Sequence, residues 1–261
     1  MTPQIARRAL AAVVSATALV AVVAAAPAGA VGGVGGAAAP VTIHPGTEVN
    51  YGGVSCEAGA VLHQGRTLFL AVPASCGGID AGKPHNSCYG PQTPVGSPVG
   101  IAGAKHLGKL VYSSFTEMQL EGTTAPYRCF YNDLSLVRVD RRDWSRVRAA
   151  IPGTGAPRAL LSTFPASGTA LKIGASTGTA GATSNRGWSL SATSSGMFKT
   201  ADVGAPITAG NNLVGMLLVL PQGPAPGTPL ESPAQTYNLA RSLHLLREVR
   251  GFHHVALLRA G

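Results

Sequence analysis

The stretch Ser55–Gly78, which reads SCEAGAVLHQGRTLFLAVPASCGG, is the clearest indication of the fold class. Within it, the short apolar runs Gly59–Leu62 and Thr67–Val72 are separated by polar residues and a glycine. Similar runs between Gly, Pro, Ser and Asn clusters continue along the chain, at Leu134–Val139, Thr169–Ile173, Trp188–Ala192 and Asn212–Leu220. The segment Leu213–Leu220 is almost continuously apolar, as expected of a strand that is buried on both faces. Runs of this length between turn residues predict an all-β protein.

The C-terminal part of the chain departs from this strand pattern. Leu239, Leu243 and Leu246 recur at helical spacing, and Gly251 is placed to end the run. The sequence therefore predicts an α-helix over Ala234–Arg250 that packs through its leucine stripe. No earlier segment has a convincing helical periodicity.

The N-terminal residues have the pattern of a targeting signal. Arg7 and Arg8 precede an apolar run, Ala9–Ala26, and the small residues Ala28-Gly29-Ala30 follow it. This order predicts a signal peptide over residues 1–30 and an extracytoplasmic protein, either secreted or associated with the cell envelope. A membrane anchor is the alternative, but the run is rich in alanine and short for the ~20 residues that span a bilayer. The Gly- and Ala-rich residues 31–40 predict a flexible lead-in.

Charge and cysteine content restrict the partners and the chemistry. The chain has 20 Lys and Arg against 11 Asp and Glu, and without Arg7 and Arg8 it keeps about +7, which favours anionic ligands. The basic residues are scattered without interleaved aromatic residues, so we expect no nucleic-acid binding. The cysteine spacing does not fit a zinc site and His253-His254 is assigned to the C-terminal tail, so we expect no metal and no cofactor. An exported chain with four cysteines is expected to form disulfides.

Three segments, in order, resemble the active-site motifs of trypsin- and chymotrypsin-like serine proteases, particularly the small secreted bacterial branch of α-lytic protease and streptogrisin. In Ser55–Gly78, the family places its catalytic histidine immediately before the second cysteine, where this chain has Ser75. In Tyr131–Asp140, which reads YNDLSLVRVD, Asp133 falls on the catalytic aspartate. By this resemblance, the chain retains the catalytic aspartate as Asp133 and has Ser75 in place of the catalytic histidine.

The third segment covers the nucleophile. Thr200–Met216, which reads TADVGAPITAGNNLVGM, is similar to the family's Gly-Asp-Ser-Gly-Gly-Pro turn, and Val203 stands at the serine. A fourth segment, Ile173–Gly181, which reads IGASTGTAG, looks like the Gly-x-Ser-Thr-Gly segment of the bacterial branch. The resemblance covers Thr42–Leu220.

The resemblance implies two six-stranded antiparallel β-barrels, to which the leucine periodicity adds the C-terminal α-helix. We expect a monomer with one domain over residues 41–250 and a tail over 251–261. Four cysteines allow three pairings, of which we favour Cys56–Cys76 with Cys88–Cys129. The carried-over site has Ala201 and Val203 as backbone donors of the oxyanion hole and Met197 at the pocket floor. Asp202 takes a structural position.

Few of the groups that proteolysis requires remain in this chain. Proteolysis in this family needs a hydroxyl nucleophile, an imidazole base and an orienting carboxylate. Val203 has no nucleophilic atom, and the Ser75 hydroxyl is no base near neutral pH. Loss of both groups lowers kcat on the order of 10⁶-fold, which is ~8 kcal/mol of barrier. Asp133 is then interpreted as an orphan carboxylate, hydrogen-bonded to nearby backbone or to Ser75.

These observations favour a catalytically inactive serine protease homologue that binds a protein, a peptide or an anionic envelope ligand. Two other classes stay open. One is an active serine-type endopeptidase or hydrolase with a displaced triad. The other is a structural envelope protein held by charge through its Arg-rich C-terminal segment.

Overall fold

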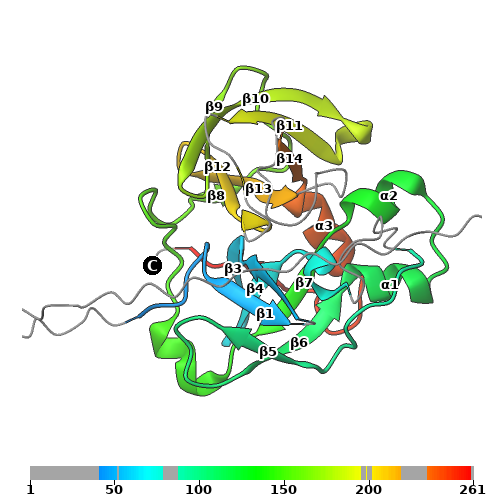
Figure 1. The fold of residues 1–261 in the computed structure, drawn as a ribbon, viewed down its shortest axis with the longest axis vertical. Helices are drawn as coiled ribbons and strands as arrows, with labels where there is room; N and C mark the ends of the chain where they lie inside the picture. Colours follow the sequence, from blue (N-terminus) through cyan, green and yellow to red (C-terminus); the bar gives the residue numbers. More distant parts are fainter. Residues whose placement is uncertain are drawn as a thin grey trace, which may run out of the picture. The chain divides into compact units, whose positions relative to one another are not determined.

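The computed structural model of the chain describes residues 41–51, 53–78, 88–194, 198, 202–218 and 234–259. These residues form two β-sheets (Figure 1). The first is antiparallel, has eight strands in the order β15-β3-β4-β7-β6-β5-β1-β2, and curls without a closing pair. Its strands are β1 (Glu48–Tyr51), β2 (Val54–Glu57), β3 (Ala60–Gln64), β4 (Thr67–Val72), β5 (Pro98–Ile101), β6 (Gly108–Ser113), β7 (Ser135–Arg138) and β15 (Ala256–Leu257).

The second sheet has seven strands in the order β12-β9-β10-β11-β14-β13-β8, and an additional pairing of β12 with β13 closes six of them into a barrel. Strand β8 lies outside this barrel, parallel to β13. The predicted all-β, two-barrel fold class is therefore confirmed, with one closed barrel and one curled, open sheet. The strands of this sheet are β8 (Ala159–Leu160), β9 (Ala170–Ile173), β10 (Ser176–Ser184), β11 (Ser189–Ser194), β12 (Pro206–Ala209), β13 (Asn212–Leu218) and β14 (Ala234–Tyr237).

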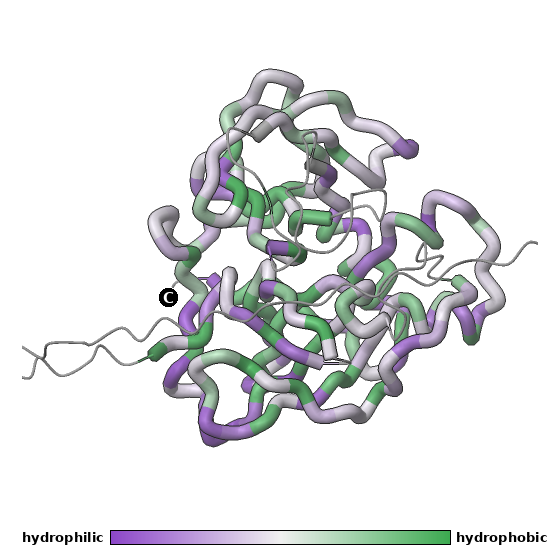
Figure 2. The backbone as a smooth tube through the Cα atoms, in the orientation of Figure 1, coloured by the Kyte–Doolittle hydropathy of each residue, from purple (hydrophilic) through white to green (hydrophobic). Residues whose placement is uncertain are grey.

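Strand β13 separates two hydrophobic cores, which explains its continuous apolar sequence. Val214 and Leu217 point into the core of the closed barrel, with Leu171, Ile207 and other barrel residues. Leu213 and Met216 belong to the core between the two sheets. Both faces of the strand are thus buried, as the sequence predicts. Figure 2 shows the hydrophobic colour concentrated along such inner strands.

The C-terminal helix is present but shorter than predicted. Helix α3 spans Leu239–Leu246, and Asn238 caps it by accepting a hydrogen bond from the Arg241 amide at 3.0 Å. The prediction was wrong for residues 234–237, which form β14 between β11 and β13. Strand pairing that completes the barrel outweighs the local helical pattern there. The leucine stripe is confirmed, since Leu239, Leu243 and Leu246 are buried in the core between the sheets.

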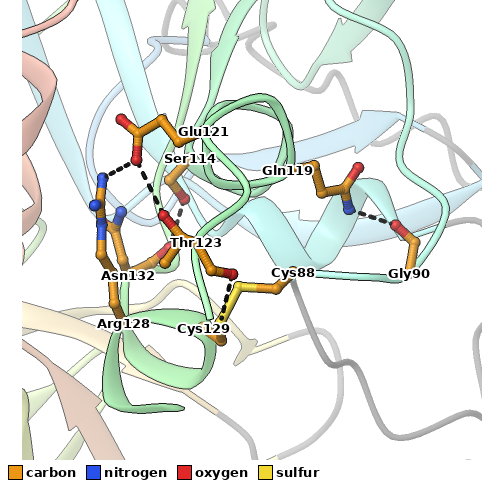
Figure 3. Close-up of a disulfide and its surroundings, with 9 residues drawn as sticks. All are labelled: Cys88, Gly90, Ser114, Gln119, Glu121, Thr123, Arg128, Cys129 and Asn132. Atoms are coloured by element: carbon orange, nitrogen blue, oxygen red, sulfur yellow. Dashed lines mark hydrogen bonds and ion pairs between the residues drawn. A yellow bond between two sulfur atoms is a disulfide. The ribbon is translucent and has the colours of Figure 1, made fainter. Parts of the chain in front are cut away.

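Two short helices precede β7 and were not predicted. Helix α1 spans Ser114–Leu120, and α2 spans Pro126–Tyr131. Figure 3 shows how the Cys88–Cys129 disulfide, an Arg128–Glu121 ion pair at 2.7 Å and a Gln119–Gly90 hydrogen bond hold them together. These helices are only seven and six residues long, too short for periodicity to reveal them. They fix the segment that leads into Asp133.

Both favoured disulfides are present, Cys56–Cys76 and Cys88–Cys129, and they use all four cysteines. The C-terminal residues also join the fold, because β15 pairs with β3 and Val255 and Leu257 are buried. Residues 1–40, which carry the predicted signal peptide and lead-in, lie outside the described residues. Within the described part of the chain, none of the helices is long and apolar enough to cross a membrane.

Candidate functional site

Ser75 and Asp133 meet at one end of the first sheet. Strand β4 pairs with β7 through Val72 and Ser135, so the residues just beyond these two positions lie close together. The chain after β4 turns into a short 3₁₀ helix, η1 (Ala74–Gly77), which contains Ser75. The Ser75 amide donates to Asp133 Oδ1 at 2.7 Å, and the Ser75 hydroxyl donates to Asp133 Oδ2 at 2.8 Å. One residue therefore occupies both oxygens of the carboxylate.

The Asp133 carboxylate is buried, with 1% of the residue exposed. Burial raises its pKa to about 6, although the hydrogen bonds from Ser75 and from the Ala74 amide partly offset this effect. None of the described Lys, Arg or His side chains forms an ion pair with it. Its buried neighbours include Tyr237. The pKa of Tyr237 is raised well above its ordinary value, first by burial and then by the negative charge of Asp133. Asp133 is thus a buried carboxyl group without a cation.

The turn that contains Val203 packs against the same region. The Val203 carbonyl accepts a hydrogen bond from the Glu57 amide at 2.8 Å, and its side chain lies in a hydrophobic cluster with Cys56 and Cys76. Gly204 has a φ of +94°, and a Cβ there would lie 2.0 Å from the Glu57 carbonyl oxygen and 2.8 Å from Pro73 Cδ. Only glycine fits so close an approach. The turn is therefore pressed against the β2–β3 corner and against Pro73, two residues before Ser75.

Known structures share this arrangement of strands. No protein-family model and no curated protein matches the sequence. Among solved structures, Thermobifida fusca Protease A matches with a TM-score of 0.51 at 17% identity, over 84% of this chain and 99% of that one. Cellulomonas bogoriensis chymotrypsin matches with a TM-score of 0.50 at 16% identity, over 84% and 99% of the two chains. This chain has the fold of the chymotrypsin-like serine proteases.

Two residues of the expected chymotrypsin-like site lie outside the described residues. They are Met197, assigned to the pocket floor, and Ala201, assigned to the oxyanion hole. Both assignments stay predictions. The structure does bring Ser75, Asp133 and the Val203 turn into one region of the fold.

Three carboxylates gather beside the Val203 turn. Glu48 and Glu57 are cross-strand partners in β1 and β2. Burial, followed by the charges of Asp202 and Glu48, raises the pKa of Glu57 to about 7. Glu57 is therefore partly protonated at neutral pH. No group of three or more His, Cys, Asp and Glu side chains within the described ranges is arranged to hold a metal ion.

A histidine–carboxylate pair, His106 with Asp143, lies elsewhere in the chymotrypsin-like fold. His106 Nδ1 lies 3.0 Å from Asp143 Oδ2, which resembles the contact between base and orienting carboxylate in hydrolases. Asp143 also accepts the amides of Lys105 at 3.1 Å and His106 at 2.9 Å, so it anchors the β5–β6 loop. None of the hydrogen bonds among described residues joins His106 to a hydroxyl. Sequence reasoning missed this pair because the partners are 37 residues apart and no local motif links them.

Proposed function

We propose that this chain is a chymotrypsin-like protein without proteolytic activity that acts outside the cytoplasm by binding. The observation that carries the proposal is the double hydrogen bond from Ser75 to Asp133. Ser75 binds the Asp133 carboxylate at the position where the chymotrypsin-like proteases have the imidazole of their catalytic histidine. Val203, at the expected nucleophile, is a buried hydrocarbon side chain.

This arrangement leaves no group for the covalent steps of proteolysis. The nucleophile must form a bond to the scissile carbonyl carbon, and a base must take its proton and return it to the leaving amine. Val203 has no atom for the first task. The Ser75 hydroxyl donates a hydrogen bond to Asp133, and as a neutral alcohol it does not act as a base near pH 7. The two replacements together cost on the order of 10⁶ in kcat.

The partner that we propose is a protein, a peptide or an anionic ligand of the cell envelope. The formal net charge, +9 for the whole chain and about +7 without Arg7 and Arg8, supports an anionic partner. The two disulfides support an oxidising compartment, because such bonds persist mainly outside the reducing cytosol.

A rescue experiment tests the loss of chemistry. The purified protein is compared with the double variant Ser75→His/Val203→Ser, and with Ser75→His/Val203→Ala as the control that lacks a nucleophile. We expect fluorophosphonate labelling and ester hydrolysis only in the variant that gains both groups. Labelling of the native chain by the probe, lost after a serine other than Ser75 is replaced, would overturn the proposal.

The His106–Asp143 pair is the observation that favours the second candidate, a hydrolase with a displaced triad. In that case the native chain reacts with the fluorophosphonate probe and His106→Gln abolishes the reaction. If the chain is the proposed binding protein, neither the native protein nor the His106→Gln variant is labelled. A charge-held envelope protein, the third class, predicts no labelling together with release from the cell-wall fraction by salt.

A further inference from the structure

A cavity of about 680 Å³ opens between the C-terminal helix, the edge of the first sheet and the edge of the second. Helix α3 contributes Leu243, and its C-cap residue Arg247, four residues further on, lies on the same face. Strands β15 and β3 contribute Leu257 and His63, and β8 contributes Leu160. Both β15 and β8 are edge strands of their sheets, so the cavity lies where neither sheet continues.

The cavity is separate from the region of Ser75. His63 pairs with Leu68 near the start of β4, whereas Ser75 follows the opposite end of that strand. At about 3.3 Å per residue, β4 alone places about 13 Å between Leu68 and Val72. The two regions also share none of their residues.

The lining combines an apolar floor with a basic rim. Leu160, Leu243 and Leu257 form part of the floor, and Leu243 and Leu257 are 1% and 8% exposed. The rim includes the exposed side chains of Arg247 and Arg259. None of the cavity's lining residues is an Asp or a Glu. Two arginines thus line one cavity, and no acidic residue of the lining compensates their charge.

Arg247 is held in place at this rim. Its Nε donates to the Val255 carbonyl at 2.9 Å, which ties the end of α3 to the segment before β15. Its two terminal nitrogens have no partner among the described residues, and Arg259 has none either. A guanidinium presents parallel N–H donors that match a carboxylate. The arginines therefore leave donors available for an anion.

We infer that this cavity binds a small amphiphilic carboxylate, with its alkyl chain on the leucine floor and its carboxylate between Arg247 and Arg259. The volume lies within the roughly 300–1,000 Å³ of small-molecule sites. Apolar burial on the leucines supplies affinity, and the two arginines select a carboxylate over a neutral head group. An inorganic anion would leave the apolar floor uncovered.

The test uses octanoate as the probe, below its micelle concentration, with the purified protein and isothermal titration calorimetry. Acetate, octanol and inorganic phosphate are the comparison ligands. We expect octanoate to bind at least about tenfold tighter than each of them, which corresponds to ~1.4 kcal/mol. If acetate, octanol or phosphate binds as tightly as octanoate, the inference is overturned.

Matched variants locate the site. Arg247→Gln/Arg259→Gln removes both rim charges, and we expect it to weaken octanoate binding by about tenfold or more. Arg250→Gln removes a nearby exposed charge that does not line the cavity, and it should leave the affinity within about twofold. Thermal unfolding without ligand checks that each variant is folded. Unchanged octanoate affinity in the folded double variant would overturn the assignment.

Discussion

Asp133 and Asp143 are two buried aspartates beside the first sheet, and their surroundings shift the pKa in opposite directions. Each accepts several hydrogen bonds, so the number of donors does not separate them. Asp133 has no cationic partner among the described residues, and burial raises its pKa to about 6. For Asp143, burial opposes ionisation, but bonds from the Lys105 amide and from His106 hold the pKa below its ordinary value.

Depth and charge explain the difference. Asp143 is shielded by His106 and Arg146, whose side chains are themselves 31% and 29% exposed, so it lies just beneath the surface. Arg146 Nε lies 3.7 Å from its Oδ1. Asp133 instead lies near Tyr237, a fully buried side chain. A buried carboxylate thus stays a stronger acid where it lies just beneath the surface beside His106 and Arg146, and becomes a weaker acid where only neutral donors contact it.

The largest expected effect is on the Asp143 side of this comparison. Asp143→Asn removes the negative charge that interacts with the His106 ring and accepts hydrogen bonds from two backbone amides. It also leaves at least one buried donor unsatisfied. We expect a loss of about 2–3 kcal/mol in the free energy of unfolding at pH 8, measured by urea denaturation. Asp133→Asn should change it by less than about 1 kcal/mol, because it replaces an uncompensated buried charge with a neutral amide. An equal loss of stability in both variants would show that the surroundings of the two aspartates do not differ in the way described.

The pH dependence of stability is the next effect. The pKa of Asp133 is about 6 in the folded chain against an ordinary value of 3.8, so between these pH values the folded state binds the additional proton. The free energy of unfolding therefore falls as pH rises from 4 to 6, on the order of 2 kcal/mol, and stays reduced above that range. Glu57, with a pKa of about 7, extends the same trend to neutral pH.

Asp143 sets the acid side of the profile. Because its folded pKa is lowered, its stabilisation is present above the ordinary value and is lost as pH falls through the folded pKa. Stability should thus be greatest near pH 4, because it falls above that value as Asp133 ionises and below it as Asp143 is protonated. Urea denaturation as a function of pH measures the profile, and Asp133→Asn should flatten its descent toward neutral pH. A descent that is unchanged in this variant would contradict the assigned pKa.

The sequence was sufficient for the parts of the fold that rest on local pattern. The strand rhythm, the doubly buried β13 and the leucine stripe of α3 follow from which residues are apolar and at what spacing. Strand β14 could not be predicted in this way, because residues 234–237 are strand only through pairing with β11 and β13. Such pairing depends on distant segments, which a local window does not contain.

The candidate site also has parts that the sequence predicts and parts that depend on packing between distant segments. The contact between Ser75 and Asp133 was anticipated, because the resemblance aligns both residues with positions that meet in the fold. The pKa of Asp133 was not, since it depends on burial and on the absence of a cation nearby among the described residues. His106–Asp143 was missed altogether, because only the packing of the β5–β6 loop against η2 (Arg141–Arg146) joins the two residues.

The Ser75 hydroxyl should make the smallest contribution to the free energy of unfolding among the groups compared. Ser75→Ala removes the donor to Asp133 Oδ2 but keeps the amide bond to Oδ1, so the carboxylate loses one of its stabilising bonds. We expect a loss of about 1 kcal/mol in the free energy of unfolding at pH 8, where Asp133 is ionised, and a smaller loss at pH 5, where it is protonated. The control is Ser55→Ala, which removes the acceptor of an exposed hydrogen bond from Asn50 and should have a small effect that does not change with pH. Urea denaturation at both pH values gives the comparison. An equal cost of Ser75→Ala at pH 5 and pH 8 would mean that the hydroxyl does not stabilise the ionised carboxylate, and that burial and the backbone amides alone set the pKa of Asp133.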